Sequence, residues 1–296
     1  GQTVQITNGP EITGDLEMNK KLAWILSPAL LAVSMSASAY DIDLFTAFQS
    51  AGDSVLGEGN FATNATSTST LDAGSIIGTE RDIQVDCITN CVDQGTTGTH
   101  EIGDLGTTMV ITGGALQFSN DASGIDGVTG TGLVQWDGTD NNIALDADGL
   151  GGIDLRGDGS SAFVFTVLNA DLDFEFIIEA YTDDDEWTRV TIAATVDGGF
   201  PETRIIQFAS LENALLCGQG PLGNGVLLIE CGSGGNFNAS NTGAFQVLLN
   251  TSDPGTAEVD LAIGSIRTIP EPTMLGLLGV ALLAGGIARR GRRSKI

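Results

Sequence analysis

Acidic side chains gathered in glycine-containing turns are the residues of this chain best suited to chemistry, and the chemistry that they suggest is calcium binding. The stretches DGTDNN (137–142), DADGLGGID (146–154) and DDDE (183–186) place carboxylate and amide oxygens close together. Calcium takes about six to eight oxygen ligands, commonly from such loops. The candidate ligands are Asp137, Asp140, Asp146, Asp148 and Asp154. Since DADGLG lacks the fifth-position oxygen and the distal glutamate of an EF-hand, ordinary Asp-Gly turns are the simpler interpretation.

Three aromatic residues suggest a second kind of binding site. Trp136, Tyr181 and Trp187 lie at the ends of apolar runs, where they would form a platform on which a sugar ring stacks. Aromatic residues at strand ends more often pack into a core or its rim. Packing is therefore the simpler interpretation, and a carbohydrate site is the alternative.

The residue types needed for common catalytic sites are scarce. His100, the only histidine, lies in a polar loop, and no Gly-x-Ser-x-Gly elbow supplies the serine of a Ser-His-Asp triad. The chain has no Walker loop and no Gly-x-Gly-x-x-Gly motif after a strand. With 34 acidic residues between positions 40 and 269, carboxylate pairs like those of glycosidases arise by chance. We therefore expect a protein that is not an enzyme.

The cysteines indicate disulfides rather than a zinc site. In the oxidising compartment to which the N-terminal segment described below directs the chain, cysteines are expected to pair. Three pairings of the four residues are open, and we expect the local ones because each would close a loop or hairpin. A zinc site would need Cys-x-x-Cys pairs or several histidines. The expected pairs are Cys87–Cys91 and Cys217–Cys231.

Short apolar and β-branched runs, separated by Asp-Gly turns, must position all these residues. Side chains alternate within the runs, as in Phe163, Phe165 and Val167, and no run is typical of a long amphipathic helix. We expect residues 40–269 to form an all-β domain, an antiparallel jelly-roll-like β-sandwich. The runs are TTMVI (107–111), ALQFS (115–119), GLVQW (132–136), AFVFTVL (162–168), DFEFIIEAY (173–181), TRVTIAATV (188–196), TRIIQF (203–208), GVLLIE (225–230), AFQVLLN (244–250) and AEVDLAIGSI (257–266).

The net charge of residues 40–269 excludes one class of binding partner, the nucleic acids. The stretch 40–269 contains five arginines, no lysine and 34 acidic residues, which gives a formal charge of −29. Such a body repels the phosphates of DNA and RNA, so nucleic-acid binding is excluded. Solvated surface acids are typical of exported, soluble domains.

A signal peptide is predicted at residues 18–39. It has a lysine pair at 20–21, an apolar stretch at 22–35 and the small residues Ala37 and Ala39 before the cleavage site, so that Tyr40 would start the mature chain. Residues 1–17 lie before Met18, and we expect them to be translated upstream sequence.

The last 27 residues, 270–296, combine three features. The stretch 273–288 is uncharged and 16 residues long, close to the lower limit of about 17 for a single transmembrane helix. The triplet before it is Pro270, Glu271 and Pro272, and the basic cluster after it is Arg289, Arg290, Arg292, Arg293 and Lys295. By the positive-inside rule these cations would stay in the cytoplasm.

This order of triplet, short apolar span and arginine cluster resembles the PEP-CTERM sorting signal. The resemblance implies recognition by an exosortase, a membrane-embedded cysteine transpeptidase that cuts near the triplet. It also implies export across the inner membrane of a Gram-negative bacterium, a transient anchor there, and delivery to the cell surface or the extracellular space. The body resembles the β-sandwich often attached to this signal, which implies fold and location only. The phrases that carry this second resemblance are IIGTERDI (76–83), GLVQWDGTDN (132–141), GLGGIDL (149–155) and FTVLNADLDFEFIIEAYTD (165–183).

Together these features predict a non-catalytic, exosortase-sorted protein of the cell surface or extracellular matrix, an adhesin or a component associated with biofilm exopolysaccharide. The alternative is a carbohydrate-binding or carbohydrate-active protein on the same sandwich. The expected partners are signal peptidase and the export machinery, the exosortase, the inner membrane for a time, and extracellular polysaccharide. Calcium is the only cofactor suggested.

Overall fold

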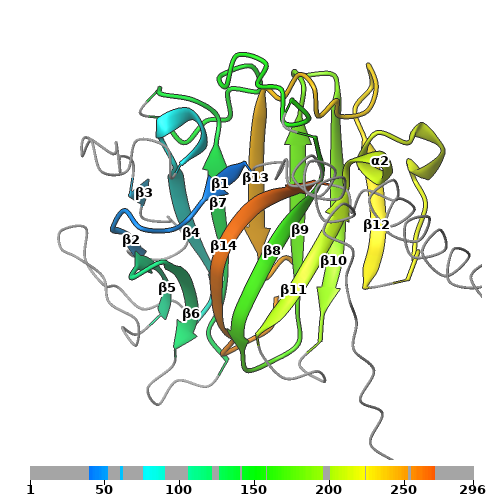
Figure 1. Ribbon diagram of the computed structural model, residues 1–296. Helices are drawn as coiled ribbons and strands as arrows, with labels where there is room; N and C mark the ends of the chain where they lie inside the picture. The colour runs from blue at the N-terminus through cyan, green and yellow to red at the C-terminus, as the bar shows by residue number, and fades with distance from the viewer. Residues whose placement is uncertain are drawn as a thin grey trace, which may run out of the picture. The chain divides into compact units, whose positions relative to one another are not determined.

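Alternating apolar side chains build two antiparallel sheets that pack face to face as a β-sandwich (Figure 1). The first sheet has the strand order β11-β8-β14-β6-β5-β2, with β1 added against β14, and the second has the order β12-β10-β9-β13-β7-β4-β3. The strands are β1 (Asp41–Asp43), β2 (Gln49–Gly52), β3 (Phe61–Ala62), β4 (Asp82–Thr89), β5 (Gly106–Thr112), β6 (Ala115–Asp121), β7 (Thr129–Trp136), β8 (Ser160–Ala170), β9 (Phe174–Tyr181), β10 (Trp187–Ala194), β11 (Glu202–Gln207), β12 (Val226–Cys231), β13 (Ala244–Leu249) and β14 (Asp260–Pro270).

The computed structural model describes residues 40–52, 61–62, 76–90, 106–121, 127–140, 142–157, 159–195, 201–223, 225–252 and 255–270. All of them belong to one compact unit, Ala37–Pro272. The predicted signal peptide, the segment before it and the predicted span at 273–288 lie outside the described residues, as do Glu271, Pro272 and the arginine cluster. Among the described helices, none is long and apolar enough to cross a membrane.

Each apolar run of the sequence forms a strand, so the predicted antiparallel sandwich is confirmed. Several boundaries differ by a few residues. The run at 257–266 corresponds to β14, Asp260–Pro270, and the run at 188–196 to β10, Trp187–Ala194. TRIIQF ends as β11 at Gln207, and Phe208 begins the short helix α2 (Phe208–Leu211). Two 3-10 turns, η1 (Ile77–Thr79) and η3 (Ala214–Leu216), complete the described helices. The sequence runs did not include β1, β2, β3 or β4.

Aromatic side chains form the centre of the core between the sheets. The ring of Phe163 on β8 lies 4.9 Å from that of Phe208 and 4.8 Å from that of Phe245, measured between centroids. Phe245 belongs to β13 of the opposite sheet, so these contacts join the two layers. Such aromatic pairs add stability beyond the apolar area that they bury.

A buried ion pair lies among these apolar residues. Arg81, just before β4, is wholly buried, and its guanidinium donates to Asp43 Oδ2 at 2.7 Å, to Gln49 Oε1 at 2.9 Å and to the carbonyl oxygen of Ala47 at 2.9 Å. The indole of Trp136 donates to the same Asp43 oxygen at 2.9 Å. The pair therefore ties β1 and the β1–β2 loop to the ends of β4 and β7.

The residue expected to start the mature chain is paired with the strand that leads into the triplet. The amide nitrogen of Tyr40 donates to Thr268 Oγ1 at 2.8 Å, and the amide nitrogen of Thr268 donates to the Tyr40 carbonyl at 2.7 Å. Ser160 on β8 contacts the same hydroxyl at 2.8 Å. The end of β14 is thus held from both sides.

One of the two expected disulfides is described in full. Cys217 and Cys231 are bonded, which joins the loop after η3 to the end of β12 and confirms this pairing. Cys87 on β4 is also disulfide-bonded, but Cys91, its expected partner, lies outside the described residues.

Candidate functional site: an acidic and polar sheet face

One face of the second sheet carries a row of polar side chains that runs directly across six strands. These residues alternate with core residues such as Ile83, Val134 and Ile178, so they lie on the face turned away from the core, called here the outer face. Each is the direct cross-strand neighbour of the next. In order from β12 to β4, the row is Glu230, Arg189, Glu179, Gln246, Gln135 and Asp82.

Glu179, in the middle of this row, accepts hydrogen bonds from three of its neighbours. Its carboxylate accepts a hydrogen bond from the Tyr181 hydroxyl at 2.6 Å and further ones from Arg189 Nε and Gln246 Nε2. Arg189 also lies 3.6 Å from Glu230. Burial, together with the hydrogen bond to Glu179, raises the pKa of the Tyr181 phenol above its ordinary value, so the hydroxyl stays a donor. With three donors on it, Glu179 organises the face and is a poor candidate for a general acid.

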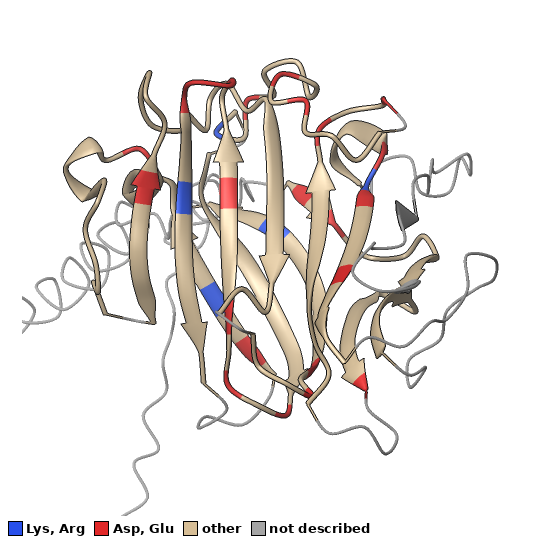
Figure 2. Cartoon of the chain, turned by 180° about the vertical axis from the view of Figure 1, so that it is seen from behind, with Lys and Arg blue, Asp and Glu red and all other residues tan. Residues whose placement is uncertain are grey.

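Acidic side chains gather at the other end of the row. Carboxylate oxygens of Glu80, Asp82 and Asp140 all lie within 4.8 Å of one another. Asp82 is opposite Gln135, and continuing this antiparallel register by two residues sets Glu80 opposite Asp137. Glu80, Asp82 and Asp137 are buried, whereas Asp140 is exposed. Figure 2 shows acidic residues on many strands and loops and few basic ones.

Asp82 is the member of this group with the most altered chemistry. Burial, followed by the charges of Glu80, Asp137 and Asp140, raises its pKa from 3.8 to about 7. No donor among the described residues hydrogen-bonds to either of its buried carboxylate oxygens. An ionised Asp82 therefore lacks the compensation that buried charges usually have.

The five aspartates predicted as calcium ligands do not form one cluster. Asp140 belongs to the acidic group and Asp137 adjoins Asp82. Asp146, Asp148 and Asp154 lie outside that group. Asp146 and Asp154 each accept a hydrogen bond from the backbone amide two residues ahead, which is an Asx turn, and Asp148 is exposed. Sequence reasoning missed Glu80 and Asp82. The signal that would have found them is the alternation in TERD, which buries Arg81 in the core and points its two acidic neighbours outward.

The predicted aromatic platform is wrong for Trp136. Its side chain is wholly buried in the core, 5.5 Å from the ring of Phe245, because it is an inward residue of β7. Tyr181 and Trp187 do lie together on the outer face, with ring centroids 6.3 Å apart. The guanidinium of Arg189 lies 5.6 Å from the centre of the Trp187 indole. Leu145 and Ala147, from the loop after β7, belong to the same small apolar cluster as this pair.

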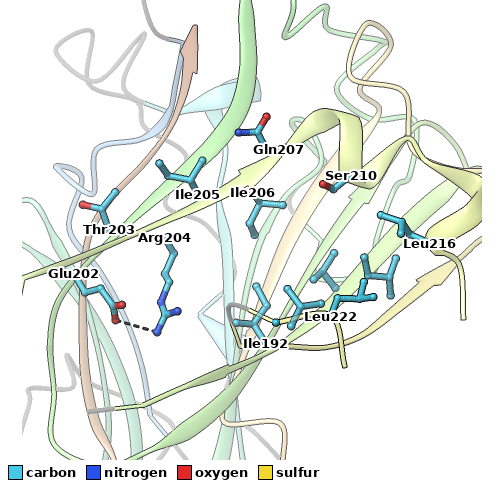
Figure 3. A pocket seen from close by; sticks show the side chains of 14 residues that line it. Ile192, Glu202, Thr203, Arg204, Ile205, Ile206, Gln207, Ser210, Leu216 and Leu222 are labelled. Carbon is cyan, nitrogen blue, oxygen red and sulfur yellow. Dashed lines mark ion pairs between the residues drawn. The ribbon is translucent and has the colours of Figure 1, made fainter. Parts of the chain in front are cut away.

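A hollow of about 640 Å³ lies elsewhere, among residues of β10, β11 and β12 (Figure 3). Its lining is mostly aliphatic, with Ile192, Ile206 and Leu222 among its residues. Arg204 lies there and pairs with Glu202 at 3.1 Å. None of the residues predicted as ligands or as a sugar platform is in this lining.

The comparison that bears on function concerns the end of β14 and the residues after it. Residues 268–293 match the model of the PEP-CTERM protein-sorting motif. The chain carries a PEP-CTERM sorting motif. This motif implies processing by an exosortase, with export and sorting to the envelope or surface of a Gram-negative bacterium. The motif begins at Thr268, so its first three residues are the last three of β14.

Other comparisons say less about the function of this chain. No curated protein matches its sequence at a significant level. One solved structure, "Structure of PfGH50B", is similar over 56% of the chain, at 9% sequence identity and a TM-score of 0.37. The matched part is 22% of that chain, and so weak a likeness carries no argument about function.

Proposed function

We propose that this protein is a non-catalytic component of the bacterial surface or extracellular matrix, an adhesin or an exopolysaccharide-associated protein that an exosortase delivers. The observation that carries the proposal is the continuity of β14 with the sorting motif. The described body between the predicted signal peptide and the motif is one sandwich, so the sandwich is the cargo. We infer a jelly-roll-like order for its strands, an architecture that lectin domains share.

The pairing of β14 supports removal of the tail from an already folded sandwich. Pro270 is paired with Ser160 on β8, and Thr268 is held by Tyr40 as well. A cut beyond Pro270 would leave these contacts intact. The sandwich would then remain folded after the tail has been removed.

A second candidate function, carbohydrate binding, is favoured by the outer face of the second sheet. Trp187 is partly exposed there and its indole is backed by the buried ring of Tyr181, and Arg189 and Gln246 provide donors held in place by Glu179. Small-ligand sites commonly combine aromatic side chains with a few polar groups in fixed positions. The two proposals agree if the matrix component binds the polysaccharide around it.

A glycan array with a parallel hydrolysis screen tests both proposals. We expect the exported protein to be retained on neutral polysaccharide without releasing reducing ends. Trp187→Ala should weaken retention by about tenfold, which corresponds to about 1.4 kcal/mol of lost stacking. Phe48→Ala removes a ring that is 54% exposed outside that face and should change nothing. Turnover of any polysaccharide would overturn the non-catalytic proposal, and equal losses in the two variants would overturn binding at Trp187.

A further inference from the structure

We propose that Glu80, Asp82, Asp137 and Asp140 together bind one calcium ion at the β4–β7 end of the outer face. This site differs from the loop site that the sequence suggested, because two of its four carboxylates come from the segment at the start of β4. It shares only Asp137 and Asp140 with that prediction.

The backbone explains why these side chains meet. Arg81 points into the core, where Asp43 fixes its guanidinium, so its neighbours Glu80 and Asp82 must point to the opposite face. Trp136 points into the core in the same way, which turns Asp137 outward. Antiparallel pairing of β4 with β7 then brings the two segments together. Like charges placed opposite one another destabilise a sheet unless something lies between them.

Unpartnered oxygens are the independent sign of a ligand. Both oxygens of Asp82 and Oδ1 of Asp137 are buried, and within the described chain none of the three accepts a hydrogen bond. Buried polar atoms in native proteins nearly always have a partner, and a buried carboxylate is costly without one. Arg81, the nearest cation in sequence, is already engaged by Asp43 and Gln49 on the far side of the strand. A cation bound beside them would give these oxygens the partner that they lack.

The rest of the site is held in place. The second oxygen of Asp137 accepts from the amide nitrogen of Asp146 at 2.8 Å and from Gln135 Nε2, which leaves Oδ1 directed elsewhere. Thr139 and Thr79 contact each other through their hydroxyls at 3.1 Å, which ties the loop carrying Asp140 to η1. At Gly149, an added Cβ would lie 1.5 Å from the carbonyl oxygen of Asp137, so only glycine permits this close approach.

The ligand chemistry selects calcium among common metal ions. All four side chains offer carboxylate oxygens, which suit hard cations and not the thiolate or imidazole preference of zinc. Calcium accepts irregular shells of about six to eight oxygens, whereas magnesium demands a regular octahedron. Asp140 is exposed and gives the ion a route in from solvent. Extracellular calcium modules bind with dissociation constants of about 10⁻⁴–10⁻³ M, which suits an exported protein.

Calorimetric titration of the exported protein with CaCl₂, and thermal melts in 10 mM CaCl₂ against EDTA at matched ionic strength, test the site. We expect one calcium ion per chain and a rise in melting temperature of about 3–8 °C. The matched ionic strength removes the general screening that would help so acidic a body. MgCl₂ at the same concentration should give a smaller shift. The proposal would be overturned if the titration with CaCl₂ released or absorbed no heat of binding and the melting temperature were the same in CaCl₂ and in EDTA.

Three substitutions locate the ion. Asp82→Asn and Asp140→Asn should each weaken calcium binding by about tenfold or more, because each removes a charged ligand. Asp140 is exposed, so its variant keeps the test valid should Asp82→Asn fail to fold. Asp148→Asn changes an exposed aspartate outside the cluster and should bind as the unaltered protein does. Wild-type affinity in Asp140→Asn, or an equal loss in Asp148→Asn, would contradict this assignment.

Discussion

Replacing Arg81 with methionine is expected to lower the free energy of unfolding by about 3–5 kcal/mol. The guanidinium is wholly buried and donates to Asp43, Gln49 and the Ala47 carbonyl, so its removal leaves the buried Asp43 carboxylate without its countercharge and takes one donor each from Gln49 and the Ala47 carbonyl. Urea unfolding should show a lower midpoint at an unchanged slope, which indicates lost stability rather than a different denatured state.

Two controls separate charge from packing in this experiment. Asp43→Leu combined with Arg81→Met should recover part of the loss, because replacing both members of a buried pair removes the stranded charge. Glu230→Gln disrupts an exposed pair with Arg189, 3.6 Å apart, and should cost at most about 1 kcal/mol. A single Arg81→Met variant as stable as the unaltered protein would show that the buried pair does not hold β1 in place.

Changing Arg289, Arg290, Arg292 and Arg293 to glutamine should abolish retention at the inner membrane and most exosortase processing. Moving each arginine through the bilayer centre costs about 2.5–3.5 kcal/mol on insertion scales, so the four together stop translocation. The sandwich should still fold, since all of its described strands end by Pro270. Fractionation should find unprocessed protein released from the membrane.

The matched control for the arginine variant is Arg267→Gln, an exposed arginine on β14 ahead of the triplet. It should be retained and processed normally. Retention of the four-arginine variant at the level of this control would contradict a stop-transfer role for the cluster.

Local pattern was sufficient to predict most of the sandwich. Alternation in a run such as β10, where Val190 and Ile192 are buried and Arg189 and Thr191 less so, follows from the two-residue period of a strand and needs no tertiary information. The first strands were missed for a physical reason. β1 and β2 are three and four residues long, and β1 contains Asp43, whose buried carboxylate is compensated by Arg81, 38 residues away, and by the indole of Trp136.

The acidic cluster of Glu80, Asp82, Asp137 and Asp140 could not be predicted from local sequence pattern. Each of its segments is typical, in isolation, of a turn or a strand end, and only the register of β4 against β7 brings Asp82 and Asp137 together. Trp136 was misassigned for the same reason, because an aromatic residue at a strand end can face either way until the register is known. The sorting signal was easier, since its three parts are contiguous, and the motif match confirms it.

The central claim is that an exosortase removes the tail and delivers the sandwich. Mass spectrometry of surface protein from an exosortase-bearing host, compared with the same host lacking the enzyme, tests it directly. We predict that mature surface protein in the first strain lacks the C-terminal peptide ending in RSKI and ends near Pro270–Glu271–Pro272, while the second strain keeps the whole tail at the inner membrane. Surface protein that still ends in RSKI, in equal amounts in both strains, would contradict the account.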